Sequence, residues 1–164
     1  MKIKLTICLL LLGTTLFSFR YARKNHSDVK PNFSGNWNIN ADNSENGGSA
    51  PIKMRLTQTD DSLIIERVTN DGQSFIERLS FDGKPCVCTT TSKRRKTGSA
   101  KWDAGDKSLT ETGTLSDTRD LNKTAFNFIE NWQLSADGRE LTLESKVTLS
   151  DGRNFTIKAV YDKE

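Results

Sequence analysis

Short alternating segments, separated by turn residues, are the feature of this sequence that most restricts its fold. From Phe33 onward apolar and polar side chains alternate, as Trp37 and Ile39 do with the asparagines beside them. A period of two places the apolar side chains on one face of a β-strand. After residue 33, no apolar run keeps the helical period long enough to predict a helix. The sequence therefore predicts an all-β chain.

Turn residues between these segments predict hairpins. Asp-Gly pairs at residues 71–72, 137–138 and 151–152 each separate two alternating segments. Such pairs favour a tight hairpin turn because glycine adopts the required positive φ at little cost. We expect about nine or ten antiparallel strands in sequential hairpins. They fall within residues 33–39, 52–57, 63–68, 75–79, 86–92, 96–102, 109–115, 125–134, 141–149 and 155–161.

Strands with one apolar face need a closed or nearly closed sheet, which buries those faces and leaves few exposed edges. An antiparallel up-and-down meander barrel of about 8–10 strands requires only short connections, and it is the architecture that we expect. A two-sheet β-sandwich remains the alternative. The predicted domain covers residues 28–164, enough chain to form a core without disulfide bonds.

The first 27 residues differ in character from the predicted domain. Lys2 and Lys4 are followed by an apolar stretch at residues 5–19 and then by further basic residues. As a helix this stretch spans about 22 Å, less than the roughly 30 Å of a bilayer core. Because small residues are poorly placed for cleavage, we expect residues 1–27 to be a signal peptide or an uncleaved anchor, with a linker. The domain is then secreted or periplasmic, and only an uncleaved leader contacts the membrane.

The positive net charge of the chain comes from this leader. It holds five of the 24 Lys and Arg residues and none of the 21 Asp and Glu residues, so 19 basic residues face 21 acidic ones in residues 28–164. That balance provides no positive field for a nucleic acid. His26 is the only histidine and precedes the domain. We therefore expect no metal, cofactor or histidine-based catalysis there, and the oligomeric state stays open.

The opening of the first predicted strand carries a family resemblance. Residues 33–40 read Phe-Ser-Gly-Asn-Trp-Asn-Ile-Asn, which resembles the Gly-x-Trp start of lipocalins. Residues 132–142 resemble the Asp-Gly hairpins of small secreted lipocalin-like, calycin-type proteins of bacteria. The resemblance implies a cup-shaped cavity for a small apolar or amphipathic ligand, with Trp37 closing one end, and it does not imply an enzyme.

Several polar side chains occupy positions on predicted apolar faces. Arg67 continues the face of Leu63 and Ile65, and Glu77, Glu130 and Ser145 interrupt others. An unpaired buried charge is costly, so these groups either line a cavity and orient a ligand headgroup or lie at the rim as solvated charges. The predicted ligand-binding residues are Trp37, Arg67, Phe75, Glu77, Phe126, Phe128, Glu130 and Trp132.

Two functions remain open for such a barrel. The first is an extracytoplasmic binding protein that holds a small hydrophobic or amphipathic ligand in its cavity. The second is a cell-envelope interaction or scaffold domain whose barrel is filled by its own side chains. Cavity volume discriminates between them, because a ligand pocket needs roughly 300 Å³ or more.

Two further features have a structural interpretation. Cys86 and Cys88 share one face of a strand, where Cα atoms about 6.6 Å apart are near the long limit for a disulfide. They form either a strained, reducible bridge or two half-buried thiols. The basic run at residues 93–96 is expected to be the solvated tip of a hairpin.

Overall fold

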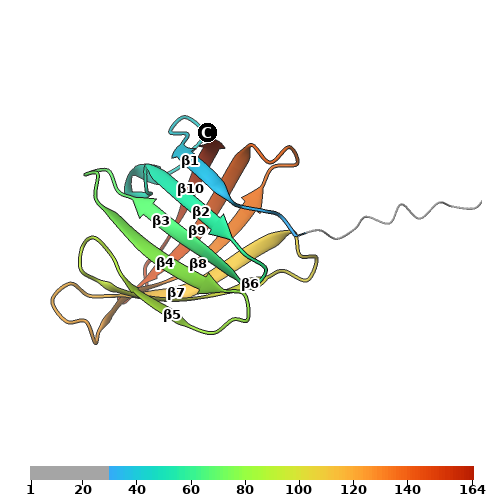
Figure 1. Ribbon diagram of the computed structural model, residues 1–164. Helices are drawn as coiled ribbons and strands as arrows, with labels where there is room; N and C mark the ends of the chain where they lie inside the picture. The colour runs from blue at the N-terminus through green and yellow to red at the C-terminus, as the bar shows by residue number, and fades with distance from the viewer. Residues whose placement is uncertain (1–29) are drawn as a thin grey trace, which may run out of the picture.

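The computed structural model describes residues 30–164, which form one ten-stranded antiparallel sheet and a short 3₁₀ helix (Figure 1). The predicted meander barrel is thereby confirmed over the two-sheet sandwich. The strands are β1 (Gly35–Ile39), β2 (Lys53–Gln58), β3 (Ser62–Val68), β4 (Ser74–Ser80), β5 (Cys86–Thr89), β6 (Arg95–Trp102), β7 (Ser108–Ser116), β8 (Thr124–Leu134), β9 (Glu140–Leu149) and β10 (Asn154–Lys163), with the helix η1 (Gly47–Ser49). The predicted leader, residues 1–27, lies outside the described residues.

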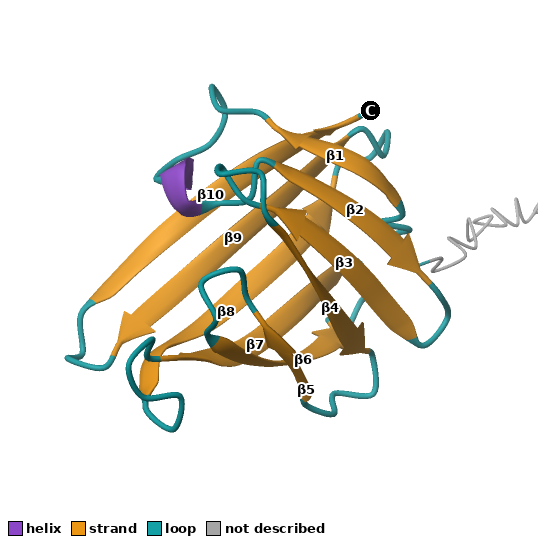
Figure 2. Cartoon of the chain, turned by 60° about the vertical axis from the view of Figure 1, so that its left-hand side comes forward, coloured by secondary structure: helices purple, strands orange, loops and turns teal. Residues whose placement is uncertain are grey.

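Pairing of β1 with both β2 and β10 curls the sheet into a barrel. Trp37 lies opposite Met54 on one side and Lys163 on the other. The strands follow one another in the order β4-β3-β2-β1-β10-β9-β8-β7-β6-β5, so β4 and β5 form the two edges. These edges lie beside one another without a backbone ladder, a boundary that we call the seam (Figure 2). The barrel is therefore closed except at the seam.

Aromatic side chains fill one end of the barrel. The ring of Phe33 stacks on Trp102 at 5.7 Å between centroids and meets the edge of Trp132 at 6.0 Å. Trp37 is buried, and its indole Nε1–H donates a 2.9 Å hydrogen bond to the Phe33 carbonyl oxygen. The indole hydrogen bond lets a large apolar ring pack there with its polar atom satisfied. This end of the barrel is therefore packed core, and Trp37 lies within it.

Two glycines make room for larger side chains inside the barrel wall formed by β6 and β7. Gly98 on β6 and Gly113 on β7 lie directly across from each other in the ladder. A Cβ atom at Gly113 would overlap the Thr97 carbonyl oxygen and the Phe128 ring, and one at Gly98 would overlap the Glu111 carboxylate. The absence of these side chains lets a ring and a carboxylate lie flat against the sheet.

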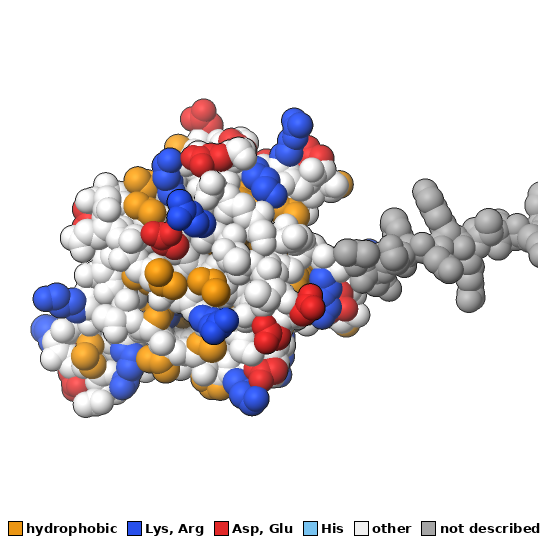
Figure 3. Space-filling model, in the orientation of Figure 1, with side chains coloured by type: hydrophobic (Ala, Val, Ile, Leu, Met, Phe, Trp, Pro, Cys, Tyr) orange, Lys and Arg blue, Asp and Glu red, His pale blue; other side chains and the backbone are white. Residues whose placement is uncertain are grey.

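Charged side chains of both signs are interspersed over the face shown in Figure 3, with apolar side chains in small groups between them. No helix within residues 30–164 has the length and apolar character needed to cross a membrane.

Candidate functional site

A cavity of about 380 Å³ occupies the half of the barrel away from the aromatic end. It reaches the turns that join β3 to β4, β5 to β6, β7 to β8 and β9 to β10, because residues beside each of these turns line it. Its wall is mainly apolar. The principal apolar lining residues are Phe75, Phe126, Phe128, Leu143, Ile157 and Ala159.

Five charged side chains gather at the bottom of this cavity, and we call them the ion cluster. They come from five different strands: Arg67, Glu77, Lys96, Glu111 and Glu130. Each occupies an inward position of its strand, where alternation would otherwise place an apolar residue. Burial of so many charges is tolerated only when they are paired and hydrogen-bonded.

Arg67 lies at the centre of the ion cluster. Its Nε–H donates to Glu77 Oε1 at 2.5 Å, and its Nη2–H donates to Glu130 Oε1 at 3.0 Å. Ser145 on β9 completes this side by donating its hydroxyl to Glu130 Oε2 at 2.6 Å. The guanidinium carbon lies 5.3 Å from the centroid of the Trp132 ring beneath it, a cation–π distance. Arg67 is thus held by two strong hydrogen bonds and one aromatic face.

Lys96 forms the second cationic centre. Its Nζ lies 2.5 Å from Glu77 Oε2 and 2.8 Å from Glu111 Oε1. The same ammonium lies 5.0 Å from the centroid of the Phe128 ring. Glu77 therefore bridges the two cations, with one carboxylate oxygen on each.

Glu111 has the poorest hydrogen bonding of the three carboxylates. Its side chain is 0% exposed, and its oxygens lie 2.8 Å from Lys96 Nζ and 3.6 Å from Arg67 Nη2. These contacts are ion pairs without hydrogen bonds, and both oxygens lack a hydrogen-bond partner. Burial raises the pKa of Glu111 to about 7, and the attraction of Lys96 offsets only part of that effect.

The other members of the ion cluster are held ionised. Burial works to raise the pKa of Glu77, but Arg67 and Lys96 outweigh it and lower that pKa to about 2. The pKa of Glu130 is lowered in the same way, chiefly by Arg67. Burial opposes the charge on Lys96, yet Glu111 and Glu77 raise its pKa. Because Arg67 binds Glu77 and Glu130 together, these two carboxylates are not arranged as a proton donor and a base.

The structure brings most of the expected site residues together. Phe75, Phe126, Phe128, Arg67 and Glu130 line the cavity. Two others lie just beneath: Glu77 pairs with Arg67, and Trp132 packs under it. Trp37 is apart from them, in the aromatic end.

Sequence reasoning missed Lys96 and Glu111. Lys96 was assigned to a solvated hairpin tip, which is wrong for this residue because its position on β6 points into the barrel, whereas Lys93 and Arg95 are exposed. The alternation itself carried the missing signal. Lys96 precedes Gly98 and Ala100 at steps of two, and Glu111 follows Leu109 on the buried face of β7.

Cys86 and Cys88 are free thiols on β5, rather than partners in the strained bridge that the sequence left open. An extended strand holds alternate residues near the limit of disulfide reach, which accounts for their separation. Burial, and then the nearby Glu77 carboxylate, raise the pKa of Cys88 to about 11. Both cysteines lie along the seam.

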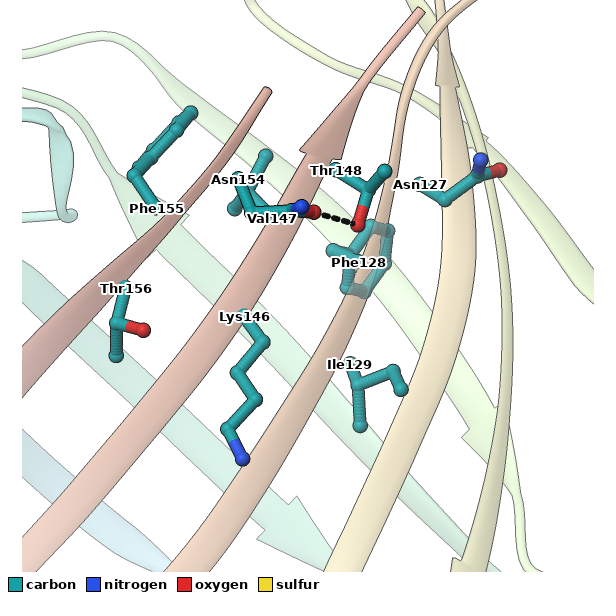
Figure 4. Close-up of a pocket in the computed structure, with 9 residues that line it drawn as sticks. All are labelled: Asn127, Phe128, Ile129, Lys146, Val147, Thr148, Asn154, Phe155 and Thr156. Atoms are coloured by element: carbon teal, nitrogen blue, oxygen red, sulfur yellow. Dashed lines mark hydrogen bonds between the residues drawn. The ribbon is translucent and has the colours of Figure 1, made fainter. Parts of the chain in front are cut away.

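A second hollow, of about 400 Å³, lies on the outer face of β8, β9 and β10 (Figure 4). Ile129, Lys146 and Thr156 border it, and Thr148 donates its hydroxyl to Asn154 Oδ1 across it at 2.6 Å. Its only charged lining residue is Lys146. The inner cavity, where apolar walls meet converging polar groups, is the stronger candidate site.

The meander, closed around an internal cavity, makes this protein an antiparallel up-and-down β-barrel. No family model matches the sequence, and no curated protein matches it. Among solved structures the chain is similar to the zebrafish ileal bile acid-binding protein, crystallised in complex with cholic acid. The two are 14% identical with a TM-score of 0.54, over 80% of this chain and 98% of that chain. At this identity the likeness is one of fold.

Proposed function

We propose that this protein is a non-enzymatic carrier that binds a small hydrophobic or amphipathic molecule in the barrel cavity. The observation that carries the proposal is the cavity itself, whose volume of about 380 Å³ exceeds the roughly 300 Å³ that a small-molecule pocket needs. Apolar walls around a few converging polar groups suit a molecule with one apolar and one polar part. A protein of similar fold binds cholic acid, which supports the proposal.

The same cavity argues against the alternative of a scaffold domain with a filled barrel. Side chains fill the aromatic end, but the other half leaves room for a ligand. We further propose that the protein acts outside the cytoplasm, as the secreted lipocalin-like proteins of bacteria do. Lys2, Lys4 and the apolar residues 5–19 support that location, because this pattern is typical of a secretory signal.

Native mass spectrometry on freshly purified protein, with lipid extraction of the same sample, tests this function. A discrete bound mass that denaturation releases is the expected result. If none is found, the protein is titrated with the neutral dye Nile red, whose fluorescence rises in apolar cavities. A bare polypeptide that also takes up no dye would contradict the proposal.

A cavity-filling variant shows whether binding occurs inside the barrel. Ala159 lines the cavity and is buried, so Ala159→Leu should weaken dye binding by about tenfold or more by occupying ligand space. Thr156→Leu places the same side chain on the exposed outer position of the same strand. It should leave dye binding unchanged. Dye binding that falls in Thr156→Leu but not in Ala159→Leu would assign binding to the outer hollow that Thr156 borders.

A further inference from the structure

The charges at the bottom of the cavity do not suit an acidic ligand. The ion cluster contains two cations, Arg67 and Lys96, and three carboxylates, so its formal charge is negative when all five groups are ionised. Arg67 has a carboxylate within 4 Å at three places, and Lys96 at two. The Arg67 Nε and Nη2 atoms and the Lys96 ammonium are therefore paired with carboxylates before any ligand arrives.

The carboxylate that a ligand meets is Glu130. It lines the cavity, and its side chain is 13% exposed, compared with 3% for Glu77 and 0% for Glu111, which do not line it. Ser145 lies beside it and directs its only hydroxyl proton toward Glu130 Oε2. The serine oxygen and the carboxylate oxygens are therefore hydrogen-bond acceptors next to the ligand space.

The other charged residues and Tyr161 in the cavity wall do not add an unpaired cation or a free hydroxyl proton. The charged residues among those that line the cavity are Arg67, Lys96 and Glu130. Tyr161 donates its hydroxyl to the Pro51 carbonyl at 3.1 Å, so its proton is engaged as well. Within the described part of the chain, the cavity thus holds acceptors near its bottom and no cation without a carboxylate partner.

We propose, resting on the ligand-carrier function above, that the polar end of the ligand is a hydrogen-bond donor, a hydroxyl or an amine, seated against Glu130 and Ser145. A carboxylate ligand would bring a further anion to two cations that already pair with Glu77 and Glu130, and it would have to displace Glu130 from Arg67. A hydroxyl or ammonium group instead finds acceptors already in place. The charge arrangement therefore selects against fatty-acid-like ligands.

Three ligands with the same apolar chain test the proposal on the full-length protein: decanol, decylamine and decanoate. Their affinities are measured by displacement of Nile red near neutral pH. Decanol and decylamine are expected to bind at least about tenfold more tightly than decanoate. The alcohol separates donor chemistry from charge, because it is neutral. Decanoate binding as tightly as decanol would overturn the inference while leaving the carrier function intact, and failure of all three ligands and the dye would overturn both.

Glu130→Gln provides the matched variant. The amide has the same size but removes one negative charge from the group nearest the ligand, so decanoate affinity should rise by about tenfold and decylamine affinity should fall similarly. Glu66→Gln, on the outward face of β3 beside Arg55, is the control and should change none of the affinities. Unchanged ligand preference in a folded Glu130→Gln protein would contradict the assigned position of the polar end.

Discussion

Lys96 on β6 reaches past the seam to Glu77 on β4, with Nζ 2.5 Å from Oε2. The backbone forms no ladder between β4 and β5, so side chains must connect the two edges of the sheet there. This buried ion pair belongs to the same cluster that forms the bottom of the cavity. Closure of the barrel and the polarity of the candidate site therefore depend on the same residues.

Replacing Lys96 should open the seam. Lys96→Met keeps much of the side-chain volume but leaves Glu77 and Glu111 short of a cation in the interior. We expect the free energy of unfolding to fall by about 3–5 kcal/mol, the usual cost of breaking a buried pair. Urea denaturation near neutral pH measures it. Lys146→Met, on the exposed face of β9, should stay within about 0.5 kcal/mol. Equal effects would show that Lys96 has no special role in closure.

Glu111 should make stability depend on pH. Its pKa is raised from the ordinary value of 4.5 to about 7, so the folded state binds the proton more tightly than the unfolded chain does. This contribution is complete below pH 4.5 and is lost as the pH rises through 7. Glu77 acts in the opposite sense, because its pKa of about 2 gives stability that is lost only as the pH falls from 4.5 through 2.

The variant Glu111→Gln isolates the first of these effects. The unmodified protein loses the Glu111 contribution as the pH rises, and the variant does not. The difference in the free energy of unfolding, variant minus unmodified protein, should therefore increase by about 1–3 kcal/mol when the pH is raised from about 5 to about 8. Urea denaturation at the two pH values gives the difference. Parallel curves for the two proteins would show that Glu111 titrates normally in the fold.

Gly113 should not tolerate a methyl group. Gly113→Ala would press its Cβ against the Thr97 carbonyl and the Phe128 ring, so we expect a loss of about 1–3 kcal/mol and a change in Nile red binding, since Phe128 lines the cavity. Gly48→Ala is the control, because a Cβ there meets nothing within 4 Å. Thermal unfolding of both variants measures the effect. If Gly113→Ala left the stability unchanged, the Phe128 ring would have moved aside without loss of free energy.

Cys88 should react slowly. The Cys88 side chain is half-buried and its pKa is about 11, so little of it is thiolate near pH 8. In a Cys86→Ser background, iodoacetamide should alkylate the native protein at least about tenfold more slowly than the protein in urea. Mass spectrometry follows the reaction, and Cys8 in residues 1–27 is distinguished by peptide mapping. Equal rates in the two states would show that the seam does not shield the thiol.

The fold could be predicted from the sequence because alternation and Asp-Gly turns are local signals. Gly72, Gly138 and Gly152 all adopt the positive φ that these turns require. The ten strands lie close to the expected segments, although β5 ends at Thr89, before the expected residue 92, because the turn to β6 begins there. The seam could not be predicted, because each hairpin is specified locally while the closing edge depends on curvature accumulated over the whole sheet.

The site was predictable only in part, for a related reason. Alternation placed Arg67, Glu77 and Glu130 on inward faces, but it could not show that they meet. The Arg67–Glu77 contact joins neighbouring strands of one hairpin, but the Arg67–Glu130 contact joins residues 63 positions apart, on β3 and β8, which only the closed barrel brings together. Lys96 was not predicted to be buried because it belongs to a run of basic residues, and such runs are usually solvated. Its alternation with the buried Gly98 and Ala100 on the same strand indicated the opposite.

The positions of β1 and β10 have a consequence for folding. The Glu164 amide donates to the Asn36 carbonyl at 3.0 Å, so the last strand lies against the first described strand on the side of the barrel opposite the seam. A circular permutant, joined there and opened within residues 81–85, would keep every hydrogen-bonded strand pair. It would also turn the β1–β10 pairing from the most distant in sequence into a local hairpin. The permuted chain should have a lower contact order and therefore fold faster to the same barrel.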